Sequence, residues 1–94
     1  MRNYEVALIA HPELNEEALA GLIERVKGWI TASGGVVGEI DQMGRRRLAY
    51  AIRRQSEGQY VFVPAQLPPD AARELERNLR LTEPILRFMI TLVE

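Results

Sequence analysis

Cysteine is absent from the 94 residues, lysine and histidine occur once each, and long apolar runs are missing. Without cysteine there is no disulfide, no thiol nucleophile and no cysteine metal site, which fits a reducing, cytoplasmic setting. No stretch approaches the roughly 18 apolar residues of a membrane span, and the amino terminus has no signal-peptide pattern, so a soluble protein with no membrane partner is expected. The lone His11, in a turn before Pro12, makes neither a metal centre nor a catalytic triad. We therefore predict no catalytic residue, no metal, no cofactor and no small-molecule substrate.

The length and the charge pattern indicate a single domain, residues 1–94, with a polar partner. The net charge is only −1, but it is unevenly distributed. Up to Gly44 three basic residues face seven acids, a net charge of −4, whereas from Arg45 onward nine arginines face six acids, a net charge of +3. Eleven of the twelve basic residues are arginine, whose planar fork binds phosphate and carboxylate groups bidentately. The composition favours RNA or a carboxylate partner, although codon usage or a warm habitat also enriches arginine.

Hydrophobic periodicity and turn residues predict six elements in the order strand, helix, strand, strand, helix, strand. The first helix should begin after an Asn15 N-cap and end at Gly34. The second should follow Asp70. The expected strands are Arg2–Ala10, a long irregular Val36–Ile52 with bends at Gly38 and Gly44, Gln59–Leu67 after a polar connection Arg53–Gly58, and Ile85–Leu92.

Each expected helix has one apolar stripe, so both can cover the same face of one sheet. This predicts an α+β, ferredoxin-like βαββαβ fold with a four-stranded antiparallel sheet, two helices on one face, and the first and third strands in the centre. In the last strand Leu86, Phe88, Ile90 and Leu92 should point inward, and Ile85 outward. Pro64 conflicts with a central strand, because proline lacks the ladder donor. Either a bulge lies at Pro64 or the strand order is wrong.

The segment Gly44–Ile52, G-R-R-R-L-A-Y-A-I, sets three arginines beside an apolar alternation. Leu48, Tyr50 and Ile52 are expected to enter the core. Alternation places Arg46 on the face of Leu48, with Arg45 and Arg47 on the other, unless a bulge near Gly44 shifts the phase.

In this context the segment resembles the signature of bacterial small-subunit ribosomal protein six. The matching residues are Gly44, Arg46, Arg47, Leu48, Ala49, Tyr50 and Ile52, and the opening Met1–Glu5 is similar too. The resemblance runs from end to end, with departures at Ala51, where many members have proline, and at Pro64. It implies a non-enzymatic structural constituent of the small ribosomal subunit, in the cytoplasm. It also implies binding to the central domain of small-subunit ribosomal RNA as a heterodimer with ribosomal protein eighteen.

The candidate RNA-binding residues are Arg2, Arg46, Arg47, Arg80 and Arg87. For Arg46 and Arg47 the alternative is a solvated edge strand that charge protects from aggregation. Arg2 and Arg87 lie on strands that should be neighbours, so they are expected to form one basic spot. Pairing of these two with Glu5 or Glu94 is the alternative. Arg45, Arg53 and Arg54 have no assigned role.

Tyr60 and Phe62 should lie on the open face of the sheet. There they suit either a protein-partner interface, which we prefer, or stacking on RNA bases. A function of a different class remains open, a free-standing regulatory domain of the same shape that binds a small molecule.

Overall fold

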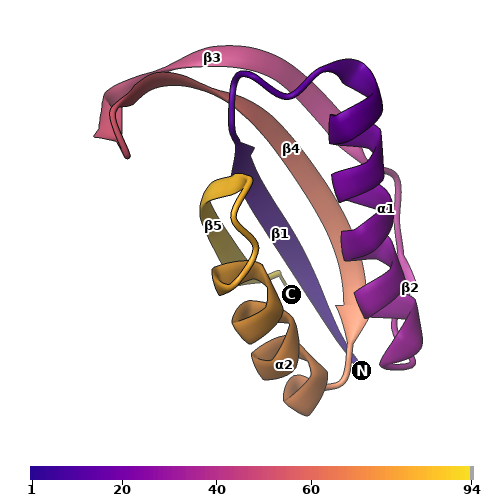
Figure 1. Ribbon diagram of the computed structural model, residues 1–94. Coiled ribbons are helices and arrows are strands. Elements are labelled where there is room, and N and C mark those ends of the chain that lie inside the picture. Colours follow the sequence, from indigo (N-terminus) through magenta and orange to yellow (C-terminus); the bar gives the residue numbers. More distant parts are fainter. Residues whose placement is uncertain (94) are drawn as a thin grey trace.

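Two helices pack side by side on one face of an antiparallel sheet in the computed structural model, which describes residues 1–93 (Figure 1). The expected α+β, ferredoxin-like architecture is confirmed. The elements in chain order are β1 Arg2–Ala10, α1 Glu16–Ala32, β2 Val36–Val37, β3 Asp41–Ile52, β4 Gln55–Leu67, α2 Pro69–Arg80 and β5 Ile85–Leu92. Neither helix within residues 1–93 is long and apolar enough to cross a membrane.

The sheet has the predicted strand order, with β4 and β1 in the centre and β5 at one edge. The other edge is divided between β2 and β3, both of which pair with β4. This division resolves the conflict at Pro64. The pairing of Pro64 with Glu5 of β1 is regular, and the Pro64 carbonyl accepts a 2.7 Å bond from the Gly38 N–H on the other side. Proline has no backbone N–H to donate. At Pro64 that N–H would point to the same side as the carbonyl, where the edge strand is interrupted, so no hydrogen bond between strands is lost.

The core lies between the helices and the even positions of β1. Val6, Leu8 and Ala10 are fully buried. Helix α1 covers them with a single apolar stripe made of Leu19, Leu22, Ile23, Val26 and Ile30. Asn15 caps this helix by accepting a 2.8 Å bond from the Ala18 N–H. Gly34, at φ +86°, and Gly35 end it, because the Gly35 N–H reaches back to the Ile30 carbonyl.

Strand β5 departs from the predicted alternation at both ends. Phe88 and Ile90 pack against the core as predicted. Ile85, expected to point outward, is buried instead, because the β1–β5 register shifts between Ile9 and Ala10 and the phase of β5 changes with it. Leu92, also expected to point inward, is 45% exposed.

The predicted strand Val36–Ile52 is interrupted at Gly38 and bulged at Gly44, whose φ is +80°, as the two glycines indicated. The expected polar loop Arg53–Gly58 is wrong. Strand β4 already begins at Gln55, and only Arg53 and Arg54 form the turn. Pairing with β1 ends at Gln59, so residues 46–58 form a two-stranded ribbon with no third strand. We call this segment the projecting ribbon, and it arches beyond the sheet in Figure 1.

Candidate RNA and protein interface

The arginine triplet starts directly after the Gly44 bulge, and the register of β3 with β4 fixes where each side chain points. Arg45 lies opposite Gln59, Arg46 opposite Gly58 and Arg47 opposite Glu57. Because directly paired residues share a face of the sheet, Arg45 and Arg47 lie on the face that carries the helices. Arg46 points to the opposite, open face. The predicted alternation within the triplet therefore holds.

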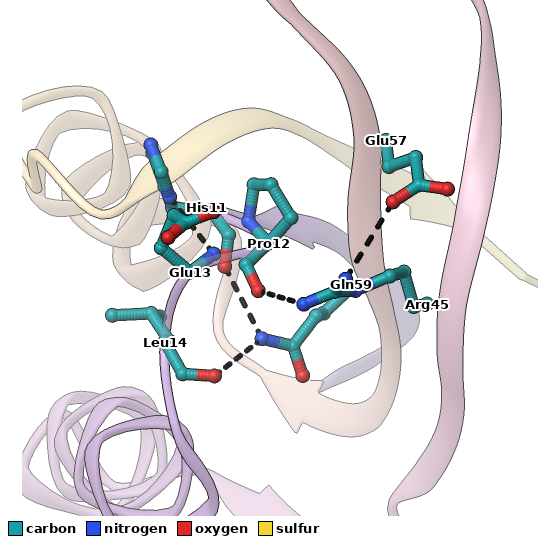
Figure 2. Close-up of polar contacts among 7 residues, drawn as sticks. All are labelled: His11, Pro12, Glu13, Leu14, Arg45, Glu57 and Gln59. Carbon is teal, nitrogen blue, oxygen red and sulfur yellow. Dashed lines mark hydrogen bonds and ion pairs between the residues drawn. The ribbon is translucent and has the colours of Figure 1, made fainter.

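Arg45 is occupied by contacts within the protein, and sequence reasoning left its role unassigned. Its Nη2 donates a 2.6 Å bond to the carbonyl of Pro12, and its Nη1 lies 3.7 Å from a carboxylate oxygen of Glu57 (Figure 2). The neighbouring Gln59 donates through Nε2 to the carbonyls of His11, at 3.2 Å, and Leu14, at 2.9 Å. Two side chains from paired positions thus hold three carbonyls of one loop. The sequence did contain a sign of these contacts. Gln59 is a polar residue at a core-facing position, and such a residue needs hydrogen-bond partners.

Arg46 and Arg47 are both exposed on the projecting ribbon. Arg46 makes one local bond, 3.3 Å from Nε to the carbonyl of Met43. The side chain of Arg47 makes no hydrogen bond or ion pair to any of residues 1–93. Both guanidinium groups therefore retain donors for an external anion.

The tip of the ribbon is a tight turn of two arginines. Arg53 has φ +48° and Arg54 has φ +65°, which agrees with the positive φ values of a type I′ hairpin turn. Arginine seldom adopts this region, and each such residue costs about 1 kcal/mol or more. The side chain of Arg53 reaches back to the loop before β5, where Nη2 donates to the carbonyls of Glu83, at 2.9 Å, and Ile85, at 2.6 Å.

The apolar residues of the triplet segment do not enter the main core, contrary to expectation. Leu48 is 7% exposed, but it lies over Gly58 on the open face, away from the core cluster between sheet and helices. Tyr50 is 60% exposed, and its hydroxyl oxygen accepts a hydrogen bond from Nη1 of Arg87. Ile52, near the tip of the ribbon, is only partly buried. The predicted alternation is present. It shows which residues share a face of the strand, but it does not show which of the two faces packs against the helices.

Tyr60 and Phe62 lie on the open face, as predicted, and are partly buried there. They line an apolar pocket of about 190 Å³ together with Ala7, Ile9 and Met89, and Arg87 stands at its edge. Met89 is 59% exposed. A pocket of this composition can receive one apolar side chain of another molecule.

Arg2 and Arg87 do not form one basic spot. Strands β1 and β5 are neighbours, as expected, but the residue opposite Arg87 is Ile9, seven positions from Arg2. At about 3.3 Å per residue the two arginines lie some 23 Å apart along the sheet. Instead, Arg87 and Arg80 line one open cleft of about 570 Å³ with Arg53. Arg80 also lies 3.6 Å from a carboxylate oxygen of Glu76, one turn earlier on α2.

The described residues offer no arrangement typical of an active site. Across residues 1–93 no three side chains among His, Asp and Glu lie close enough to hold a metal ion. His11 has a structural contact, since its Nδ1 accepts a 3.1 Å bond from the Glu13 N–H. The candidate functional features are therefore the exposed arginines of the ribbon and the apolar pocket on the open face.

Comparison with known proteins agrees with this picture. The family model described as ribosomal protein S6 matches residues 3–91. Small ribosomal subunit protein bS6 of Clostridium novyi is 47% identical over 90 residues, which cover 96% of this chain and 95% of that protein. The same protein of Moorella thermoacetica is 42% identical over 94 residues, covering 100% and 96% of the two chains.

The fold is similar to that of a protein whose crystal structure is known. 30S ribosomal protein S6 of Thermotoga maritima superposes with a TM-score of 0.92 at 32% identity, over 98% of this chain and 87% of that one. Together these matches favour a non-enzymatic ribosomal protein over a regulatory domain that binds a small molecule. The chain belongs to the ribosomal protein S6 family, whose members are proteins of the small ribosomal subunit.

Proposed function

We propose that this protein binds the central domain of small-subunit ribosomal RNA together with ribosomal protein eighteen, as a structural component of the subunit. The arginines of the projecting ribbon are the main support for RNA binding. The ribbon presents Arg46 and Arg47 outside the sheet, both exposed, and only a local bond to Met43 occupies either guanidinium within residues 1–93. Arginines placed in this way suit phosphate oxygens, which position a protein on RNA.

Arg80 and Arg87 would add a second contact to the RNA backbone. They share a cleft beside the tip of the ribbon, so an RNA strand lying along the ribbon would pass over them. Arg2 would make a separate contact, because it lies at the other end of β1.

Ribosomal protein eighteen would cover the open face. The pocket between Tyr60 and Phe62 is almost entirely apolar, and aromatic residues around such a pocket are typical anchors of a protein interface. Stacking on RNA bases is the alternative use of these two rings. The partly buried state of both side chains favours the protein interface, because a stacked base needs an exposed ring face.

A filter-binding titration tests the proposal directly. Central-domain RNA is mixed with this protein alone, with protein eighteen alone, and with both together. Joint retention of the RNA at lower protein concentrations than for either protein alone is the expected result. If the pair retains the RNA no better than protein eighteen alone, this protein contributes nothing to binding and the proposal is wrong.

A further inference from the structure

We infer that Arg45 and Arg53 are positioning residues that hold the projecting ribbon in place, so that Arg46 and Arg47 meet RNA in a fixed orientation. This inference rests on the proposed function. One hairpin carries five arginines, at positions 45–47 and 53–54, and their guanidinium groups differ in what they contact. Two of them donate to backbone carbonyls of distant loops, and their immediate neighbours do not.

The ribbon needs such support because of its position in the fold. From Gly58 outward β4 has lost its β1 partner, and β3 pairs with β4 alone. A two-stranded hairpin is at best marginally stable in water. Its ladder is also irregular, because the register shifts between Arg47 and Ile52. Left to its own pairing, the ribbon would sample many orientations relative to the sheet.

Arg45 and Arg53 tether it at opposite ends, and between them the hydroxyl of Tyr50 accepts a hydrogen bond from Arg87 of β5. At the root, Arg45 donates to Pro12, and the paired Gln59 donates to His11 and Leu14, which joins the ribbon to the loop between β1 and α1 (Figure 2). At the tip, Arg53 donates to Glu83 and Ile85, which joins the turn to the loop between α2 and β5. The two loops themselves are joined by a 2.8 Å bond from the His11 N–H to the Pro84 carbonyl. The ribbon is therefore fastened at both ends to one end of the sheet.

The turn at the tip supports this interpretation. Positive φ at Arg53 and Arg54 is unfavourable for arginine, and glycine or asparagine would suit both positions better. The arginine at position 53 is explained by its side chain, whose two bonds to carbonyls offset the backbone cost. Holding the ribbon before RNA arrives removes an ordering cost from binding, which is the general benefit of preorganisation.

The test compares Arg45→Met and Arg53→Met with Arg46→Met, a matched loss of one charge on the same hairpin. Each is titrated with central-domain RNA and protein eighteen over a range of salt concentrations. For the two tether variants we expect affinity to fall about tenfold, while the slope of log affinity against log salt stays at the wild-type value. For Arg46→Met the slope should fall by about one unit. A similar loss of slope in Arg45→Met or Arg53→Met would identify that residue as a phosphate contact and overturn the inference.

Amide hydrogen exchange of the free protein provides a second readout that needs no RNA. In the Arg45→Met/Arg53→Met double variant, amides of residues 46–58 should exchange at least about tenfold faster, while those of Val6 and Leu8 in the core stay protected. Unchanged exchange in the ribbon would overturn the inference even if RNA affinity fell. If the wild-type pair of proteins fails to retain the RNA, the proposed function fails instead, and exchange still decides whether the tethers hold the ribbon.

Discussion

Replacing Gly35 with alanine should be one of the most damaging single-methyl additions in this fold. Gly35 lies where α1 ends and the chain turns toward β2. A Cβ there would stand 2.6 Å from the carbonyl oxygen of Gln66 and 2.9 Å from that of Ile30. Both atoms are backbone, so no side-chain rotation relieves the overlap. Relief requires the chain to move away from β4, which weakens the short β2–β4 pairing.

The expected cost is about 3 kcal/mol, the upper part of the usual range for overpacking, because backbone atoms yield less than side chains. A domain of this size is stable by roughly 5–15 kcal/mol, so the variant should still fold. Its melting temperature should fall by roughly 12–24 °C. Urea denaturation followed by circular dichroism gives the free energy of unfolding, provided that the slope m is unchanged.

Gly28→Ala is the matched control for this substitution. Gly28 lies inside α1, and no atom comes within 4 Å of a Cβ placed there. Alanine should therefore stabilise the protein by about 0.5–1 kcal/mol through its higher helix propensity. If Gly35→Ala costs less than about 1 kcal/mol, or if both variants destabilise the protein equally, the close packing derived for the end of α1 is incorrect.

Three further substitutions test separate parts of the account. Asn15→Ala should lower the free energy of unfolding by about 1 kcal/mol in urea denaturation, because it removes the cap on the Ala18 N–H; no change would contradict the cap. Leu48→Ala should cost about 2 kcal/mol by the same measurement, since Leu48 is nearly buried over Gly58, and a cost near zero would mean that the open-face contact is not formed. Phe62→Ala should weaken binding to protein eighteen by at least about 1 kcal/mol in calorimetry, with equal affinity arguing against the open face as the interface.

The parts of the fold that could be predicted from sequence are those with strong periodicity. Strand β1 has the predicted bounds Arg2–Ala10, and α1 combines a single apolar stripe with Asn15 before it and two glycines after it. The strand order followed from the handedness of the connections. At Pro64 neither expected outcome is found, because the strand order is as predicted, the pairing with β1 is regular, and the interruption lies in the edge strand instead.

The projecting ribbon was mispredicted for a physical reason. Gln55, Ser56 and Glu57 have no second neighbouring strand, so they show no apolar alternation and look like a loop. The tight turn at Arg53 and Arg54 lacks the usual Asn-Gly signal, because contacts with a distant loop stabilise it.

In the candidate site, too, the contacts that depend on distant residues could not be predicted from local sequence. Period-two alternation separates two faces of a strand, but only the assembled fold shows that Leu48 packs on the open face. Whether Arg2 and Arg87 meet depends on the register of β1 and β5, which no local pattern reports. The role of Arg45 depends on Pro12, more than thirty residues away in the chain.

If the exposed arginines of the ribbon bind RNA phosphates, as we propose, their loss must reduce the salt dependence of RNA binding. The affinity of this protein with protein eighteen for central-domain RNA is measured from low to high salt, for the wild type and for Arg46→Ala/Arg47→Ala. In the double variant the slope of log affinity against log salt should be smaller by about 1.4–1.8 units, the contribution of two phosphates. An unchanged slope would contradict the proposal.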